Sequence, residues 1–265
     1  MSGGTRVGRA GIAIAMAIGL GIGTHAEARH GPRGDVIVEI VDERGVRFEQ
    51  FPTRSSGNAY RAYVRAERGA PYRILVRNGT GERVGVVIAV DGRNIISGER
   101  SELGRSEPMY VLTPWSRQEY TGWRTSLSDV HEFYFTDWRD SYAEAFGDRS
   151  AKGVIAVAVY REKERPPELF RQPYEERAER DGKSAESPSA SAKRSDEPGT
   201  GFGDRRHEPA VRVAFEAERR AASKLFLKYE WAETLCRKGI AECERDRNRF
   251  WDDDLAFAPY PPGRR

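Results

Sequence analysis

Residues 84–90, VGVVIAV, and residues 153–160, GVIAVAVY, decide the fold class of this chain. Both runs are apolar without the alternation that marks a strand with one face in water. Continuous Val- and Ile-rich runs of this length are typical of strands buried on both faces. We therefore expect two central strands of a β-sheet, with other parts of the chain packed on either side.

Shorter strands are expected around these two runs. Alternating apolar residues indicate strands at 36–40, 46–51, 60–64, 72–76, 109–112, 117–120 and 131–135, and 109–112 with 117–120 should form a hairpin. Turn residues such as the Asn-Gly-Thr-Gly stretch at 78–81 separate them. Regular short strands with turn signals between them are typical of a sandwich or barrel. We predict a mainly β protein, with an antiparallel β-sandwich over 34–162 and short helices at 126–130 and 141–146.

The composition changes after the predicted sandwich. Residues 163–209 contain six prolines, many charges and a Ser/Ala tract. Such a segment buries too little apolar surface to offset the ordering of its backbone, so we expect a disordered insertion or linker. The rest of the chain is divided into 210–252, a small disulfide-bearing segment that packs on the sandwich, and 253–265, a Pro-rich tail. Within 210–252 we expect strands at 211–217 and 224–229 and a helix at 231–238, with a helix over 214–224 as the alternative.

The first 28 residues have the pattern of a secretory signal peptide. Arg6 and Arg9 precede an apolar stretch over 11–24, and Ala26, Glu27 and Ala28 fit an A-x-A cleavage site. The stretch is short, and rich in Gly and Ala, for a membrane span. We expect an exported mature chain that begins near Arg29, in the periplasm or at the cell surface, without a transmembrane segment.

Charge and cysteine content narrow the function classes. The chain has 44 Lys and Arg against 41 Asp and Glu, a net charge of +3, and loss of residues 1–28 makes it +2. Thoroughly mixed charges are unlike the basic footprint of a nucleic-acid binder, so no nucleic-acid partner is expected. Cys236 and Cys243 point to a disulfide in an exported protein. The alternative is a metal-ligand pair, but six intervening residues without a nearby His do not fit a zinc site.

A catalytic site is the less favoured interpretation of the polar residues. Asp129, His131, Asp137 and Asp140 lie within twelve residues, where an acid–base or metal site is conceivable. We expect instead a structural His131 near the end of a strand, and no metal or cofactor. The alternative function is a hydrolase acting on envelope polysaccharide or peptidoglycan, with Asp91, His131 or Asp140 as acid–base groups.

Aromatic residues in predicted turns are the better functional lead. We predict Trp115, Trp123, Trp138 and Tyr142 as binding residues. Exposed aromatic side chains on sandwich loops bind glycans or protein partners through a large contact area. The alternative is that these rings fill the ends of the core. The favoured function is a non-enzymatic binding or structural module whose partner is an envelope protein or glycan, with self-association as a further possibility.

Four motifs in a fixed order carry a family resemblance. They are DGRNIISG at 91–98, GWR at 122–124, SYA at 141–143 and GVIAVAVY at 153–160. In this series the chain resembles a group of exported bacterial β-rich proteins that share D-G-x-N, G-W-R, S-Y-A and G-V-I-x-V-A-V. The likeness covers about residues 70–162. It implies a small β-rich domain from a Gram-negative source, and it brings no activity, cofactor or catalytic residue.

Overall fold

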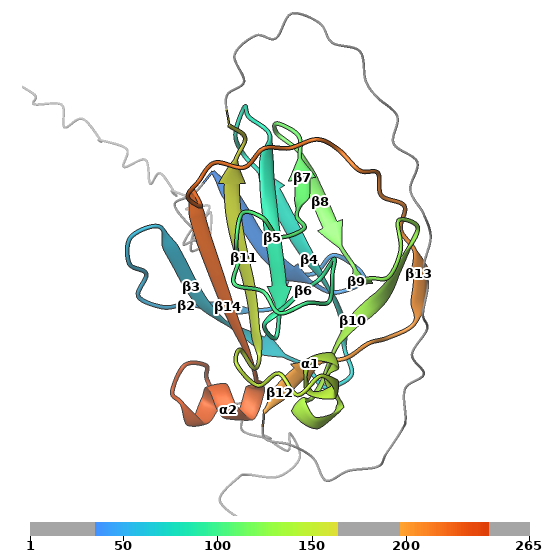
Figure 1. Ribbon diagram of the computed structural model, residues 1–265. Helices are drawn as coiled ribbons and strands as arrows, with labels where there is room; N and C mark the ends of the chain where they lie inside the picture. Colours follow the sequence, from blue (N-terminus) through green and yellow to red (C-terminus); the bar gives the residue numbers. More distant parts are fainter. Residues whose placement is uncertain (1–34, 164–196, 244–265) are drawn as a thin grey trace, which may run out of the picture. The chain divides into compact units, whose positions relative to one another are not determined.

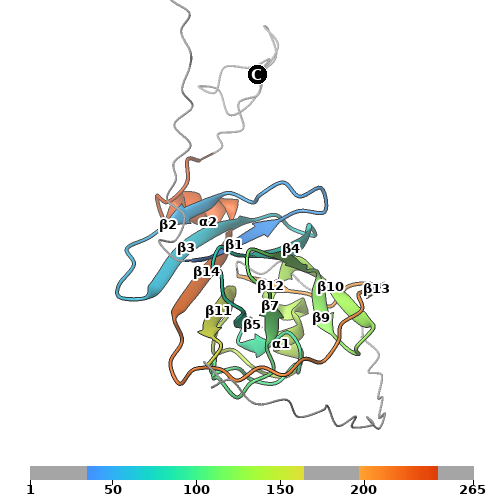
Figure 2. The same cartoon turned by 90° about the horizontal axis from the view of Figure 1, so that it is seen from above.

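The computed structural model describes residues 35–163 and 197–243 and contains two β-sheets, so the predicted mainly β fold is confirmed. The expected signal peptide at 1–28, the tail at 253–265 and most of the expected linker lie outside the described residues. Figures 1 and 2 show the arrangement from two directions. Apolar side chains from both sheets form one buried cluster between them.

Each sheet has seven strands. The first contains β1 (Val36–Val41), β4 (Pro71–Asn78), β8 (Arg117–Tyr120), β9 (Gly122–Arg124), β10 (Asp129–Asp137), β12 (Pro198–Thr200) and β13 (Arg205–His207). The second contains β2 (Gln50–Pro52), β3 (Ala59–Ala66), β5 (Val84–Val90), β6 (Arg93–Asn94), β7 (Tyr110–Leu112), β11 (Val154–Arg161) and β14 (Ser223–Trp231). The short helices are η1 (Trp138–Asp140), α1 (Tyr142–Ala145) and α2 (Ala232–Arg237).

The two continuous apolar runs are central strands, as predicted. β5 and β11 pair antiparallel along their length, and every residue of β5 is buried. Val86 and Ile88 face the cluster between the sheets, whereas Val87 and Ala89 belong to a second buried cluster on the other side. Leu103 and Ala217, from loops outside the sheets, help to cover that second side, which explains why alternation is absent.

The C-terminal segment joins the sandwich as a strand rather than packing on its surface. β14 lies between β3 and β11, parallel to β3 and antiparallel to β11. Leu225, Leu227 and Tyr229 all enter the core between the sheets. The prediction of a separate segment that docks on the sandwich is therefore corrected, because β14 completes the second sheet.

The strand predicted over 211–217 does not form. Val211 and Val213 are 83% and 54% exposed, and Ala217 alone makes an isolated bridge, to Glu162. Alternation is not enough for a strand, because a strand also needs a partner to pair with along its length. β5 and β11 are already paired on both sides, so this segment crosses over the molecule between β13 and β14 (Figure 1).

The last part of the predicted linker is also ordered. β12 and β13, within residues 197–209, both pair antiparallel with β10. Thr200 is fully buried, and its hydroxyl bonds to the hydroxyls of Tyr72 and Tyr229, each at 2.8 Å. Few apolar residues are needed to order this segment, because its backbone forms hydrogen bonds with the sheet. The prediction of disorder is wrong for 197–209.

Of the short helices, some are confirmed and one is not. The Ser141 hydroxyl accepts the Glu144 N–H at 3.2 Å and caps α1, and α2 forms before Gly239, whose φ is +67°. The disulfide between Cys236 and Cys243 is present. The helix predicted over 126–130 is absent: residues 126–128 form a bend, in which the Ser126 hydroxyl bonds to the N–H and the carboxylate of Asp129, and β10 begins at Asp129.

Candidate binding site

The four predicted binding aromatics do not form one surface. Trp115 is 73% exposed, whereas Trp123 and Trp138 are 2% and 4% exposed, and Tyr142 is half-buried. Trp115 lies in the β7–β8 connection, at the opposite end of the sheets from α1 and η1, where Trp138 and Tyr142 lie (Figure 1). Only the indole of Trp115 is presented to solvent as the sequence analysis expected.

Trp123, Trp138 and Tyr142 fill one end of the sandwich. The Trp123 ring stacks on Tyr142 at 4.3 Å between centroids, and its Nε1–H donates to the carbonyl of Gly201 at 2.9 Å. The Nε1–H of Trp138 donates to a carboxylate oxygen of Glu144 at 2.7 Å. Aromatic side chains with a satisfied polar atom are typical of cores. Trp123 and Trp138 therefore fill the end of the core, which is the alternative to the exposed binding role predicted for them.

The four motifs of the family resemblance meet at this same end. Asp91 accepts the Gly153 N–H at 2.8 Å, which joins the first motif to the fourth. The Trp123–Tyr142 stack joins the second to the third. Gly98 has a φ of +71°, and a Cβ atom there would lie 2.7 Å from the Tyr142 hydroxyl oxygen, so the first motif also lies against the third. The motifs make interior contacts, which accounts for the pattern without a binding surface.

The connection that carries Trp115 links the two sheets. β7 pairs with β5 in the second sheet, whereas β8 pairs with β4 in the first. The predicted hairpin of 109–112 with 117–120 is therefore wrong. The chain crosses between sheets at residues 113–116, beside the turn that joins β4 to β5.

One buried side chain fixes both of these turns. Asn78 is 1% exposed, and its Nδ2 donates to the carbonyls of Glu82 and Thr113 at 2.8 and 2.9 Å. Its Oδ1 accepts from the backbone N–H and the hydroxyl of Thr80 at 3.0 and 2.7 Å. The Asn78 N–H also donates to the Ser116 carbonyl at 2.9 Å. Asn78 thus ties the β4–β5 turn to the β7–β8 connection, a role that its place in an Asn-Gly turn did not reveal.

Trp115 is held in an unfavourable backbone conformation. Its φ is +56°, in the left-handed region that bulky residues rarely adopt, at a cost of roughly 1 kcal/mol or more. Its N–H donates to the Thr80 carbonyl at 3.1 Å, and its ring lies beside Gly81. The fold therefore holds a large, mostly exposed indole in a fixed position.

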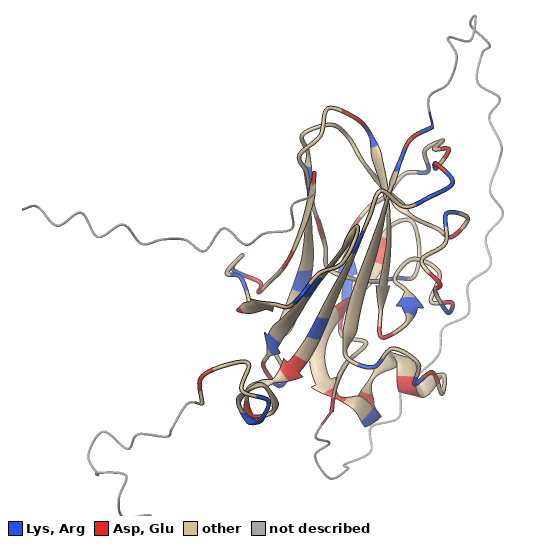
Figure 3. Ribbon diagram, turned by 90° about the vertical axis from the view of Figure 1, so that its left-hand side faces the viewer, with Lys and Arg blue, Asp and Glu red and all other residues tan. Residues whose placement is uncertain are grey.

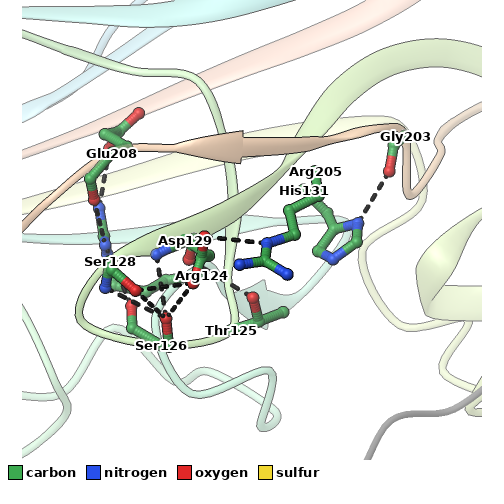
Figure 4. A network of polar contacts seen from close by, with 9 residues as sticks. All are labelled: Arg124, Thr125, Ser126, Ser128, Asp129, His131, Gly203, Arg205 and Glu208. Carbon is green, nitrogen blue, oxygen red and sulfur yellow. Dashed lines mark hydrogen bonds and ion pairs between the residues drawn. The ribbon is translucent and has the colours of Figure 1, made fainter.

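The polar residues around His131 are used within the fold (Figure 4). The Asp129 carboxylate accepts from Ser126, Ser128 and Arg205, and these bonds lower its pKa to about 2. A ring nitrogen of His131, Nδ1, bonds to the Gly203 carbonyl at 2.9 Å, and its ring stacks on Phe202 at 4.1 Å. These contacts hold the returning chain after the insertion against β10.

A second network in the same view secures Glu208. The guanidinium of Arg124, 7% exposed, donates to the Glu208 carboxylate at 2.8 Å and to its carbonyl at 2.9 Å. Its Nε–H donates to the Tyr110 hydroxyl at 2.7 Å. A buried guanidinium with this many partners positions backbone and is not free to bind a ligand.

The groups considered for a hydrolase are not brought together. Asp91 is fully buried in the turn after β5, with Gly153 N–H, Thr200 N–H and the Tyr229 hydroxyl donating to it at 2.7–2.8 Å. His131 lies within β10, and Asp140 lies in η1 beyond its end. Asp137 forms an ion pair with Arg68.

Metal, membrane and homology comparisons give no further assignment. Residues 35–163 and 197–243 hold no group of three or more His, Cys, Asp or Glu that could bind a metal ion. Within the same ranges, no helix has the length and apolar character to cross a membrane. No family model, curated protein or solved structure matches this chain.

Proposed function

We propose that this chain is an exported, non-enzymatic binding module of the envelope or cell surface, and that Trp115 contacts its partner. The observation that carries the proposal is the exposed indole in a left-handed backbone conformation. Residues of this kind persist where the surrounding structure enforces them, and they concentrate at functional sites. Exposed tryptophan is also among the commonest residues that dominate binding energy.

Two further observations support the proposal. The polar groups weighed for catalysis, Asp91, Asp129 and His131, each have fold-internal hydrogen bonds. The disulfide between Cys236 and Cys243 suits an oxidising compartment.

Export predicts a defined N-terminus. N-terminal sequencing of the protein recovered from the periplasm or medium should begin near Arg29. The Cys236 and Cys243 thiols should not react with a maleimide until a reductant is added. Recovery of the intact chain from the cytoplasm, with both thiols reactive, would contradict export.

Binding through Trp115 predicts a large loss of capture in the Trp115→Ala variant. The tagged protein is crosslinked in living cells, and its captured partners are identified by mass spectrometry or glycan analysis. Removing a tryptophan that dominates an interface should reduce capture about tenfold or more. The matched control is Leu127→Ala, which removes another exposed apolar side chain, 48% exposed, and should leave capture unchanged. Equal capture by both variants would overturn the proposal.

A stability measurement separates a binding role of Trp115 from a structural one. Glycine adopts a positive φ without strain, so Trp115→Gly should be about 1 kcal/mol more stable than Trp115→Ala. Urea denaturation followed by circular dichroism measures the difference. A glycine variant that captures no partner but unfolds at the wild-type urea concentration or above fits a binding role. Strong destabilisation of both variants would mean that the ring is part of the fold.

A further inference from the structure

Two arginines face each other next to the connection that carries the exposed tryptophan. Arg77 of β4 lies directly opposite Arg117 of β8 in the antiparallel register, on the side of the sheet away from the core. Like charges at directly opposed positions destabilise a strand pair. Arg117 donates to the Glu119 carboxylate at 2.9 Å, whereas Arg77 is exposed and has no ion pair within the described residues.

This arginine pair and Trp115 belong to one corner of the sandwich. Arg117 follows Trp115 by two residues, and Arg77 immediately precedes Asn78, whose side chain fixes the Trp115 connection. The Asn78 N–H bond to Ser116 links the two segments directly. An unfavourable backbone and an unfavourable charge pair therefore occur together, and neither is explained by packing.

The outer face of β4 and β8 carries more basic than acidic side chains. On the outer face of β4 and β8, Arg73, Arg77 and Arg117 surround a single acid, Glu119, which accepts from both Arg73 and Arg117. The bond from Arg117 is the main cause of the lowered pKa of Glu119. Glu39 on the neighbouring strand is paired with Arg47 at 3.1 Å, and exposed Glu82 lies in the adjacent turn. Figure 3 shows basic and acidic residues interspersed over the described part of the chain.

We propose that this corner binds an anionic polysaccharide, with the Trp115 indole stacked on a sugar ring and Arg77 and Arg117 paired with its carboxylates. The inference rests on the proposed binding function and names its ligand class. An arginine fork matches a carboxylate in two parallel hydrogen bonds, and a flat exposed indole offers the contact area that a sugar face requires. A ligand carboxylate between Arg77 and Arg117 would also reduce their repulsion, which Glu119 offsets only on the Arg117 side.

The test uses the purified protein and two soluble polymers, polygalacturonate as the carboxylated probe and dextran as the neutral one. Affinity electrophoresis should show retardation by polygalacturonate only, and the affinity should fall as NaCl is raised from about 0.05 to 0.5 M. Arg77→Glu should weaken binding at least tenfold, and so should Trp115→Ala. The control Arg212→Glu makes the same charge change at an exposed position on the 208–222 segment, and should reduce binding less than twofold.

The stability of Arg77→Glu distinguishes a ligand role from a structural one. The introduced glutamate would face Arg117 with opposite charge, so the melting temperature should stay the same or rise. A lower melting temperature would mean that Arg77 serves the fold, and would overturn the proposal.

Each binding outcome has a defined meaning. Equal retardation by dextran, or equal losses in Arg77→Glu and Arg212→Glu, would overturn the anionic ligand class. The proposed binding function would still be supported if Trp115→Ala captured less partner in cells. Retardation by polyglutamate but not by polygalacturonate would also overturn the proposal, in favour of an acidic protein partner. Absence of retardation by any of these polymers would refute the carboxylated ligand at this corner, and the capture experiment would decide separately on binding.

Discussion

Replacement of Asp91 by alanine should lower the free energy of unfolding by about 3 kcal/mol at pH 7, and by more at acidic pH. The Asp91 carboxylate is fully buried and accepts hydrogen bonds from Gly153 N–H, Thr200 N–H and the Tyr229 hydroxyl. These donors come from the residue just before β11, from β12 and from β14, so one side chain joins the ordered end of the insertion to the second sheet. Alanine would remove the acceptor that these three donors share.

Two opposing effects set the size of this loss. Each buried donor without a partner costs about 1–3 kcal/mol, or roughly 6 kcal/mol for the three. Burial raises the pKa of Asp91 from 3.8 to about 6, although the hydrogen bonds from Tyr229, Thr200 and Gly153 lower it. A shift of this size means that ionised Asp91 costs the fold about 3 kcal/mol at pH 7, and alanine removes that cost. The net loss expected for Asp91→Ala at pH 7 is therefore about 3 kcal/mol in the free energy of unfolding.

The sign of the pH dependence follows from the direction of the pKa shift. Between pH 3.8 and about 6 the unfolded chain has released this proton, whereas the folded protein retains it. The stability that protonation of Asp91 contributes is therefore fully present below pH 3.8 and is lost as the pH rises through 6. When protonated, Asp91 can donate to the Tyr229 hydroxyl, which in turn bonds to Thr200 at 2.8 Å. The gap between wild type and Asp91→Ala should widen by up to ~3 kcal/mol from pH 7 to pH 4.

Urea denaturation of both proteins at pH 7, 5.5 and 4 measures this difference in the free energy of unfolding. The other acidic groups titrate alike in both proteins, so their effects cancel. The matched control is Asp91→Asn, because asparagine tolerates the left-handed φ of +51° and keeps one acceptor oxygen. Its stability should lie above that of Asp91→Ala, and its gap to wild type should also widen on acidification, since it does not titrate. A gap that narrows on acidification would show that the pKa of Asp91 is lowered by its hydrogen bonds instead.

The sequence predicts the strands of this fold better than their partners. The runs at 84–90 and 153–160 identify β5 and β11 because burial on both faces leaves a direct mark on composition. The position of β14 between β3 and β11 cannot be predicted in this way, because the residues of a strand do not determine which strands will be its neighbours in the sheet. For the same reason the alternating stretch 211–217 suggests a strand, although only Ala217 pairs, in an isolated bridge to Glu162.

The candidate site shows the same limit. The turn at 113–116 and the position of Trp115 within it are predictable, because turn residues and a tryptophan between two strands are local features. The bonds from Asn78 to Glu82 and Thr113, and the register that sets Arg77 against Arg117, depend on contacts between distant segments. Exposure of a tryptophan is equally non-local, since Trp115 and Trp123 both lie near predicted turns and only one is at the surface.

Trp123→Ala should be among the most destabilising single substitutions in this protein, by about 4 kcal/mol. The Trp123 ring is 2% exposed and packs edge-on against Phe133 at 5.3 Å and beside Tyr142 at 4.3 Å. Alanine would leave a cavity the size of an indole at this end of the sandwich, and the Gly201 carbonyl would lose its donor. For a domain of this size, the melting temperature should fall by about 10 °C.

Thermal unfolding of Trp123→Ala, Trp123→Phe and Trp115→Ala gives an ordered comparison. Phenylalanine keeps most of the packing of Trp123 but cannot donate to Gly201, so it should cost about 1–2 kcal/mol. Trp115→Ala should change the free energy of unfolding by less than about 1 kcal/mol, because that side chain is 73% exposed. If Trp123→Ala instead had the melting temperature of the wild type but no longer captured a partner, Trp123 would be a binding residue. The packed end near α1 would then have to open for the partner to reach it. A loss of about 4 kcal/mol, as expected for a cavity of this size, would place Trp123 in the core and leave Trp115 as the tryptophan available to a ligand.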